Sequence, residues 1–244
     1  MLVENRGSTA TLVVFHASLS KRAQTVPALQ GQDLARSTGV NLVAVADPTV
    51  ALGDIDLAWF LGNRRIGKLP PLLGPIIKHV TQCIGGERII VFGPSGGGYA
   101  AINFGRYFRD QIVLAVNPRL NMSAKPLADI TTYLNVGHRV KGRTPRKRIK
   151  QEYVTEKASA FYPDGLPFDL CIFQNTGDSV FYENQYKPFV SEMDGENRLF
   201  TRLQNTGPGH QPIPPALLRE IISAIASTEN QQEAIFRAGF SRPD

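Results

Sequence analysis

Short apolar runs alternate with segments of helical periodicity along most of this chain. The runs predict six buried strands, at residues 10–15, 41–46, 88–92, 111–116, 168–173 and 198–203. Helices are predicted between and after them, at 27–36, 70–84, from the serine turn at 93–97 to about 108, 183–193 and 214–226. Strands that alternate with helices pair in parallel. The pattern therefore predicts an α/β fold with a mostly parallel sheet of about six strands and helices on both faces.

The periodicity also predicts which side chains the helices bury. Residues 70–84 and 214–226 each carry a row of apolar positions at helical spacing, which we expect to face the core: Leu72, Leu73, Ile76, Ile77, Val80 and Ile84 in the first, and Leu217, Leu218, Ile221, Ile222 and Ile225 in the second. Segment 53–67 gives no clear pattern, and docking of the tail at 227–244 stays open.

The regular alternation stops between residues 119 and 167. Thr144 followed by Pro145 predicts an N-cap and the first position of one helix inside this segment. Because the strand pattern resumes afterwards, we interpret 119–167 as an insertion within a single domain that spans 1–244.

Length and composition agree with one soluble domain. A chain of 244 residues with 42% apolar residues can bury one substantial core. Neither a signal-peptide pattern nor a run long enough to span a bilayer is seen, so we expect a cytoplasmic protein without a transmembrane segment. Cys83 and Cys171 lie in apolar surroundings and are expected to be buried, reduced thiols.

The positive charge is concentrated in one place. The net charge is +6, and residues 139–150 alone contain seven basic residues and no acidic one: Arg139, Lys141, Arg143, Arg146, Lys147, Arg148 and Lys150. The rest of the chain is therefore close to neutral, and no nucleic-acid partner is expected.

A glycine-rich motif follows the strand predicted at 88–92. Residues 93–97 read Gly-Pro-Ser-Gly-Gly, and small helix-compatible residues come next. A strand, a tight turn and a helix in this order place Ser95 at the tip of the turn. A side chain at Gly93 or Gly97 would collide with the adjoining strand or helix. Strain at Ser95 would point its Oγ out of the sheet, where a nucleophile belongs.

A serine nucleophile needs a base and a group that orients the base. Asp178 follows the strand at 168–173, and His210 follows the strand at 198–203. Because the carboxyl ends of parallel strands lie at one edge of a sheet, both residues can converge on Ser95. We therefore predict a catalytic triad of Ser95, His210 and Asp178.

Other chemistries find less support. His79 falls within a predicted helix and His138 in the basic insertion, and both are interpreted as structural or solvated. The histidines and cysteines form no recognisable metal site, and the glycine-rich turn lacks the Lys-Ser or Lys-Thr of a phosphate-binding loop. We expect neither a metal nor a cofactor.

The order Ser95, Asp178, His210 resembles the α/β-hydrolase superfamily over nearly the whole chain. The resemblance implies an oxyanion hole made by the backbone N–H of Gly96 and that of Ala17 or Ser18. It also implies that 119–167 is a cap or lid. The acid position that some lipases use is here Asn117, which cannot serve.

The chain also departs from the superfamily pattern. Residues 1–9 leave no room for the usual first pair of strands, so we expect an N-terminally trimmed sheet. Pro94 is an unusual neighbour for the nucleophile. The sequence from Phe92 to Ala101, with Val-Asn-Pro after the next strand, is similar to hydrolase-fold proteins of bacterial surface-glycan acylation.

These observations leave three hypotheses. The leading one is a serine hydrolase that cleaves a carboxylic ester, and the second is an acyltransferase that uses the same triad on a glycan or similar hydroxyl acceptor. The third is a non-catalytic protein that binds a polyanion through its basic segment. Arg146, Lys147 and Arg148 fall in the first turn of the predicted helix, where the helix dipole disfavours cations, so they are candidates to bind an anionic substrate. The acyl group, the leaving group and the oligomeric state stay open.

Overall fold

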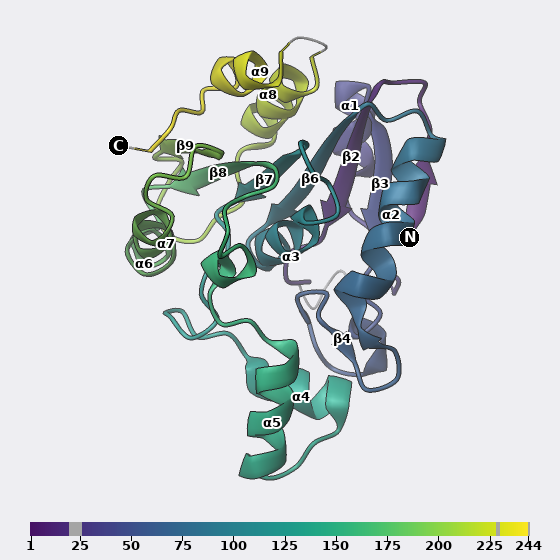
Figure 1. Ribbon diagram of the computed structural model, residues 1–244, viewed down its shortest axis with the longest axis vertical. Helices are drawn as coiled ribbons and strands as arrows, with labels where there is room; N and C mark the ends of the chain where they lie inside the picture. Colours follow the sequence, from purple (N-terminus) through teal and green to yellow (C-terminus); the bar gives the residue numbers. More distant parts are fainter. Residues whose placement is uncertain (20–25, 228–229, 244) are drawn as a thin grey trace.

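The computed structural model describes residues 1–19, 26–227 and 230–243. Within these residues, seven strands form the main sheet in the order β1-β3-β2-β6-β7-β8-β9 (Figure 1). Their bounds are β1 Leu2–Glu4, β2 Ala10–Phe15, β3 Asn41–Val45, β6 Arg88–Pro94, β7 Ile112–Val116, β8 Asp169–Asn175 and β9 Leu199–Gln204. All neighbours from β3 to β9 in this order pair in parallel. The predicted α/β sheet is confirmed.

The strand count differs from the prediction of about six. β1 adds an antiparallel edge strand, in which Leu2 pairs with Ala44 and Glu4 with Leu42. A strand of three half-buried or exposed residues has no periodicity that a sequence pattern could detect. Residues 1–9 thus form one short strand in place of the usual first pair, so the sheet is trimmed at its N-terminal side as expected but has seven strands.

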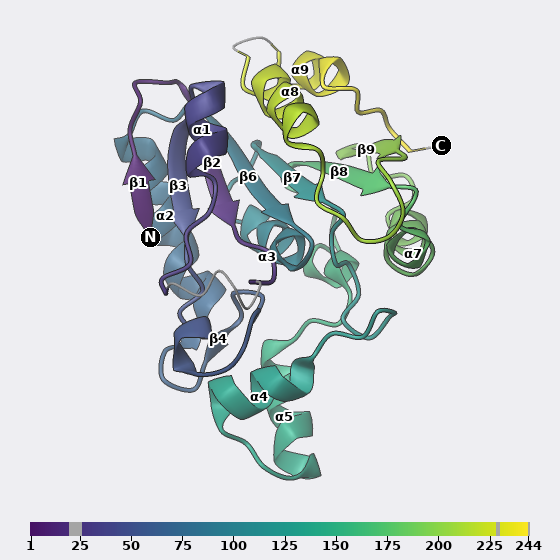
Figure 2. The same ribbon diagram turned by 180° about the vertical axis from the view of Figure 1, so that it is seen from behind.

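Helices cover both faces of the sheet, as predicted (Figures 1 and 2). One face packs against α1 (Gln32–Thr38), α8 (Pro215–Ile225) and α9 (Gln231–Arg237). The other packs against α2 (Leu69–Cys83), α3 (Gly96–Gly105), the π-helical turn η3 (Tyr182–Tyr186) and α7 (Lys187–Glu192). Shorter elements are the 3-10 turns η1 (Val50–Leu52) and η2 (Ala158–Phe161), the single turn α6 (Ser179–Phe181), and the hairpin of β4 (Gly62–Asn63) and β5 (Gly67–Lys68).

The buried face of α2 matches the predicted one only in part. Leu72 and Ile76 are each 52% exposed, and the stripe that faces the core is Leu69, Pro70, Gly74, Ile77 and Thr81. A Cβ at Gly74 would lie 2.3 Å from the Tyr107 ring, so this glycine sets how closely the helix can approach. The prediction is therefore wrong for Leu72 and Ile76, whereas the other four predicted residues are buried or pack against the core: Leu73, Ile77, Val80 and Ile84.

Two further expectations about these helices need correction. Cys83, at the end of α2, is exposed because it lies outside the buried stripe, whereas Cys171 on β8 is buried as expected. α1 begins at Gln32 rather than at 27, because Gly31 precedes it with a positive φ of 103°.

The insertion forms two helices, α4 (Ile130–His138) and α5 (Arg143–Tyr153), of which the sequence predicted one. α5 follows Gly142, so Thr144 is not its N-cap and Pro145 is its third residue. No α5 residue is buried. The two helices and the β4–β5 hairpin extend beyond the carboxyl edge of the sheet, at the lower end in Figure 1.

The tail after α8 docks onto the body. Ile235 on α9 is buried, and Phe240 is 2% exposed. Ser241 then forms an isolated antiparallel bridge with Thr201 at the free edge of β9. No helix in residues 1–19, 26–227 and 230–243 has the length and apolarity needed to cross a bilayer.

The corrected face of α2 predicts different costs for two neighbouring isoleucines. Ile77→Ala removes a fully buried side chain and should lower the free energy of unfolding by about 3 kcal/mol, because it leaves a cavity. Ile76→Ala is the matched control and should change it by less than about 0.5 kcal/mol, because that side chain is half exposed. Urea denaturation of both variants measures the difference, and equal effects would contradict the observed orientation of α2.

Candidate active site

Ser95 lies in the turn between β6 and α3. Its backbone has φ 50° and ψ −117°, a conformation that side chains rarely adopt. A Cβ at Gly93 would lie 2.0 Å from the Gly97 carbonyl oxygen, and a Cβ at Gly97 would lie 2.4 Å from that of Phe15. Glycine is therefore required at both positions, as predicted, and the Ser95 N–H is fixed by donating to the Val116 carbonyl at 2.8 Å.

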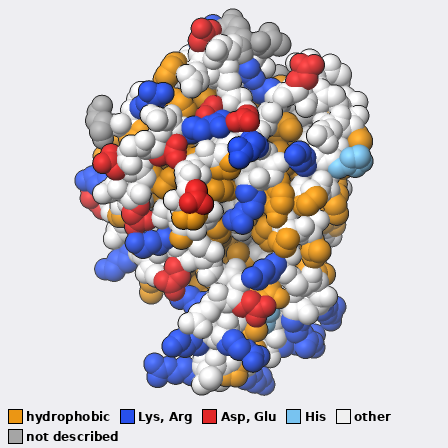
Figure 3. Space-filling model, in the orientation of Figure 1, with side chains coloured by type: hydrophobic (Ala, Val, Ile, Leu, Met, Phe, Trp, Pro, Cys, Tyr) orange, Lys and Arg blue, Asp and Glu red, His pale blue; other side chains and the backbone are white. Residues whose placement is uncertain are grey.

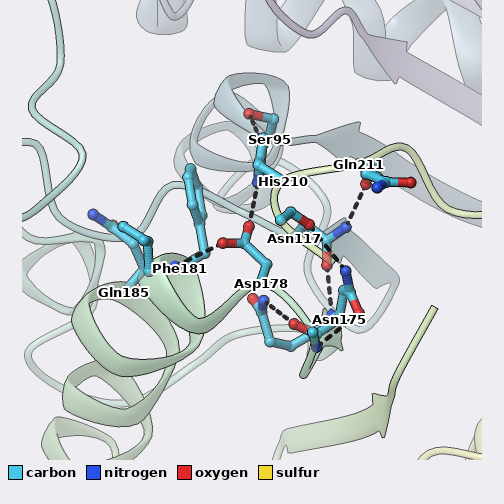
Figure 4. Close-up of polar contacts among 12 residues, drawn as sticks. Ser95, Asn117, Asn175, Asp178, Phe181, Gln185, His210 and Gln211 are labelled. Carbon is cyan, nitrogen blue, oxygen red and sulfur yellow. Dashed lines mark hydrogen bonds and ion pairs between the residues drawn. The ribbon is translucent and has the colours of Figure 1, made fainter. Parts of the chain in front are cut away.

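The structure brings Ser95, His210 and Asp178 together (Figure 4). The Nε2 atom of His210 lies 2.8 Å from Ser95 Oγ, and its Nδ1 atom lies 2.7 Å from Asp178 Oδ2. Asp178 is 2% exposed and its other oxygen accepts from the Phe181 N–H at 3.2 Å, which fixes the carboxylate at the start of α6. The three side chains form a continuous chain of hydrogen bonds from three different loops.

An aromatic stack supports His210 and was not predicted. The Phe181 ring lies parallel to the His210 imidazole, with centroids 3.8 Å apart and an interplanar angle of 19°. The guanidinium of Arg119 lies 5.6 Å from the centroid of the same Phe181 ring. Burial lowers the pKa of Arg119 to about 10. Because the two rings stack, Phe181 restricts the orientation of the His210 imidazole plane.

Two asparagines join the loops that carry the acid and the base. Asn117 accepts from the Asn175 N–H at 2.7 Å through its side chain and donates to the Gln211 carbonyl at 3.1 Å. The Asn175 amide donates to the carbonyls of Gly207 at 2.8 Å and Gly209 at 3.1 Å. These contacts hold the loop that contains His210 against the carboxyl ends of β7 and β8, next to Ser95 and Asp178 (Figure 4). Asn117, excluded as the acid, is thus a structural tie.

The predicted oxyanion-hole residues lie beside Ser95. Gly96 is the first residue of α3, where a backbone N–H has no acceptor within the helix. Ala17 and Ser18 follow β2 and line the same cavity as Ser95 and His210. Ala17 and Ser18 thus line the cavity to which Ser95 also contributes, and Gly96 follows Ser95 directly in the chain.

A buried histidine holds the loop that contains Ala17 and Ser18. His16 is fully buried, its Nδ1 lies 2.8 Å from the Ala17 carbonyl oxygen, and its Nε2 lies 3.4 Å from the Asp47 backbone nitrogen. Burial lowers the pKa of His16, so the ring is neutral, donates from Nδ1 and accepts at Nε2. In a trans peptide the C=O and the following N–H point in opposite directions. The bond to Ala17 therefore directs the Ser18 N–H away from the His16 ring.

The cavity beside Ser95 has a volume of about 790 Å³. Its walls are largely apolar and come from the ends of β2, β6 and β7, from residues 29–34 and from the segment after His210, including Leu29, Phe92, Pro94, Val116 and Ile213. Asp33 and Arg36 at its border form an ion pair with each other at 3.1 Å. Within the described chain, no residue of 119–167 lines this cavity.

The predicted substrate-binding residues lie elsewhere. Arg146, Lys147 and Arg148 are on α5, and the Arg146 Nη2 donates to Asn135 Oδ1 at 2.7 Å. Arg146 and Lys147 line a separate groove of about 460 Å³ between the helices and residues 122–131. The structure thus does not bring these cations to Ser95.

The two remaining histidines lie outside the site. His79 is exposed on α2, 3.5 Å from the Cys83 Sγ. His138 is buried in the insertion, with its Nε2 2.9 Å from the Tyr133 hydroxyl, and burial lowers its pKa. Neither contacts Ser95, His210 or Asp178 through a hydrogen bond in the described part of the chain.

No family model matches the chain, and no curated protein matches it by sequence. Solved structures do resemble it. The capsule O-acetyltransferase of Neisseria meningitidis serogroup A has a TM-score of 0.66 and 14% identity, over 88% of this chain and 87% of that one. An S-formylglutathione hydrolase from Agrobacterium tumefaciens has a TM-score of 0.55 and 15% identity, over 95% and 84%. A monoacylglycerol lipase from Paleococcus ferrophilus has a TM-score of 0.51 and 16% identity, over 93% and 94%.

These similarities show that the chain has the α/β-hydrolase fold, which the order of its strands and site residues had suggested.

The buried His138 predicts how stability depends on pH. Its pKa in the folded protein lies below the unfolded value of 6.5, so below about pH 6.5 the unfolded chain binds a proton that the folded one does not. The free energy of unfolding should therefore fall between pH 7.5 and pH 5. In His138→Gln this fall in the free energy of unfolding should be smaller. Part of it should remain, because burial also lowers the pKa of His16. Urea midpoints at both pH values measure it, and an unchanged difference in the variant would contradict the assignment.

Proposed function

We propose that the protein is a serine acyl hydrolase that cleaves a carboxylic ester through an acyl-enzyme on Ser95. The observation that carries the proposal is the hydrogen-bonded chain from Ser95 Oγ through His210 to Asp178, at 2.8 and 2.7 Å. It starts from a serine held at a positive φ. The Ser95 hydroxyl thus has His210 within hydrogen-bond distance as a base, and Asp178 orients that histidine.

In the first step, Ser95 Oγ attacks the ester carbonyl carbon while His210 Nε2 accepts the hydroxyl proton. The Asp178 carboxylate accepts the Nδ1 hydrogen, which leaves Nε2 free as the base and stabilises the imidazolium that forms. Phe181 keeps the ring in the plane that serves both contacts. His210 then gives the proton to the leaving alcohol as the tetrahedral intermediate collapses.

The negative charge on the carbonyl oxygen needs donors that are already in place. We assign this role to the Gly96 N–H at the start of α3 and to the N–H of Ala17 or Ser18 in the loop that His16 holds. The helix dipole of α3 adds a partial positive charge at the same point. Removal of one such donor typically costs about 10²-fold in rate or more.

The lining of the cavity favours a substrate whose group next to the scissile ester bond is uncharged. Its walls are mostly apolar and its charged border residues, Asp33 and Arg36, neutralise each other. Arg146, Lys147 and Arg148 on α5 lie outside this cavity. A substrate that those three cations also bind must extend from Ser95 to α5, as a glycan chain can.

A second candidate is acyl transfer, in which a hydroxyl acceptor replaces water in the attack on the acyl-enzyme. The capsule O-acetyltransferase, at a TM-score of 0.66, matches this chain better than the two hydrolases at 0.55 and 0.51. The cavity of about 790 Å³ leaves space for an acceptor beside the acyl group. Both reactions use identical chemistry up to the acyl-enzyme.

Covalent labelling tests the nucleophile and its base. A fluorophosphonate should label the wild-type protein, Ser95→Ala should not be labelled, and labelling of His210→Ala should be slower by about 10³-fold or more, because no base remains. Ser191→Ala, which removes an exposed serine on α7, is the matched control and should react like the wild type. A folded wild-type protein that is not labelled would contradict the proposal and favour a non-catalytic binding protein.

Product analysis separates hydrolysis from transfer. With an uncharged p-nitrophenyl ester, a hydrolase should release acid and nitrophenol in equal amounts, whatever hydroxyl compound is added. A transferase should release nitrophenol faster when an oligosaccharide acceptor is present and should form acylated acceptor in place of free acid, because the acceptor competes with water for the same acyl-enzyme. Mass spectrometry of the acceptor checks the outcome, and Ser95→Ala gives the background.

A further inference from the structure

Two segments far apart in the sequence form one basic end of the molecule. The β4–β5 hairpin (62–68) carries Arg64, Arg65 and Lys68, and it packs against α4. The Arg64 N–H donates to the Gly137 carbonyl at 3.1 Å, and the Tyr133 hydroxyl donates to the Gly62 carbonyl at 3.0 Å. The hairpin thus adds three cations to the seven of residues 139–150. We call residues 62–68 and 130–153 the basic end.

The cations of the basic end are mostly unpaired. Stretches 62–68 and 130–150 contain ten cations and no acidic residue, so the rest of the chain carries a net negative charge. Lys150 pairs with Glu156 at 2.6 Å, and Arg146 donates to Asn135. The other eight side chains are exposed and form no hydrogen bond or ion pair within the described part of the chain: Arg64, Arg65, Lys68, Arg139, Lys141, Arg143, Lys147 and Arg148. Glu152, within the basic end, and the neighbouring acids Asp54 and Asp129 leave a large positive excess.

The charges surround a projecting part of the molecule. Figure 3 shows Lys and Arg side chains gathered around the lower end, over the elements that Figure 1 labels α4, α5 and β4. Arg143 and Arg146 lie in the first turn of α5, which has no acidic residue, although the helix dipole disfavours cations there. Such an arrangement opposes folding by some tenths of a kcal/mol per cation, and an anionic partner would offset that cost.

Apolar side chains stand exposed among these cations. Ile66 lies in the hairpin turn between Arg65 and Lys68 and is 36% exposed. Leu127, in the loop before α4, is 74% exposed and lines a groove together with Arg143 and Lys147. A soluble polyphosphate has no apolar region to take up such side chains, whereas the interface of a bilayer takes up apolar groups and attracts cations through its phosphates. Cations and apolar tips together therefore favour a lipid surface.

We propose that the basic end binds the surface of a bilayer that contains anionic lipids. The eight unpaired cations interact with the lipid phosphates, and Ile66 and Leu127 enter the interface. Binding takes place at the surface, and it does not depend on the chemistry proposed for Ser95.

Vesicle flotation tests this proposal with the full-length chain. The protein should float with vesicles of phosphatidylcholine and phosphatidylglycerol and should stay behind with vesicles of phosphatidylcholine alone. Binding should be lost at about 0.5 M salt, where charges on a surface are screened. Equal binding to both kinds of vesicle, or no binding to either, would overturn the proposal.

Variants locate the binding surface. The triple variant Arg143→Gln, Lys147→Gln, Arg148→Gln and the triple variant Arg64→Gln, Arg65→Gln, Lys68→Gln should each weaken binding by about tenfold or more, because each lipid-facing cation contributes. The matched control is Lys78→Gln, Arg109→Gln, Arg219→Gln, which removes the same charge from exposed positions elsewhere and should stay within about twofold of the wild type. If the control variant lost as much vesicle binding, the effect would come from the net charge of the protein, and the assignment of binding to the basic end would be overturned.

A last comparison separates a lipid surface from a soluble polyanion. The double variant Ile66→Ser, Leu127→Ser should weaken vesicle binding and leave binding to long-chain polyphosphate unchanged. If it leaves both unchanged while the charge variants weaken both, the partner is a soluble polyanion and the membrane proposal fails. Ser95→Ala should bind vesicles like the wild type, so failure of the ester chemistry and failure of membrane binding can be told apart.

Discussion

The close approach of β6, α3 and the end of β2 is the contact on which the candidate site depends. Gly93 and Gly97 meet with no room for a Cβ, and Gly97 also lies against the Phe15 carbonyl. This crossing forces Ser95 into a strained backbone conformation, which costs of order 1–3 kcal/mol. All ten residues of α3 are buried, and the Ser95 N–H and C=O both have backbone partners. Burial of the helix and these hydrogen bonds offset the strain, so the serine is presented by the fold itself.

Convergence of the other two residues depends on amides rather than on the sheet alone. Parallel strands bring the loops after β8 and β9 to one edge, but loops of this length can adopt many conformations. Asn117 and Asn175 remove that freedom, because their side chains bond to backbone groups of the neighbouring loops. The position where some lipases carry the acid thus holds the loop of His210 in this chain. An aspartate in place of Asn117 would be a buried charge and could no longer donate to the Gln211 carbonyl.

The sequence predicted the elements of the sheet and the convergence of Ser95, Asp178 and His210, because apolar runs mark buried strands and parallel strands share a carboxyl edge. It did not predict Phe181 against His210, since a stack depends on the conformation of a loop rather than on spacing. It assigned Leu72 and Ile76 to the core because periodicity finds an apolar stripe without showing which stripe the neighbours cover. It also missed that Arg64 joins the basic segment, because a contact with Gly137 across so many residues leaves no local signal.

Separation of the basic end from the cavity limits which groups could stabilise the oxyanion of the proposed reaction at Ser95. The described residues of the cavity border include one cation, Arg36, and Asp33 neutralises it, so fixed dipoles must supply the stabilisation. Their strength depends on orientation, which for the Ala17–Ser18 peptide is set by the neutral ring of His16. A protonated His16 could no longer accept from the Asp47 N–H, and a charge without solvent would destabilise the loop. Burial that lowers the pKa of His16 therefore keeps the ring in the neutral form that can bond to the Ala17 carbonyl at one nitrogen and to the Asp47 N–H at the other.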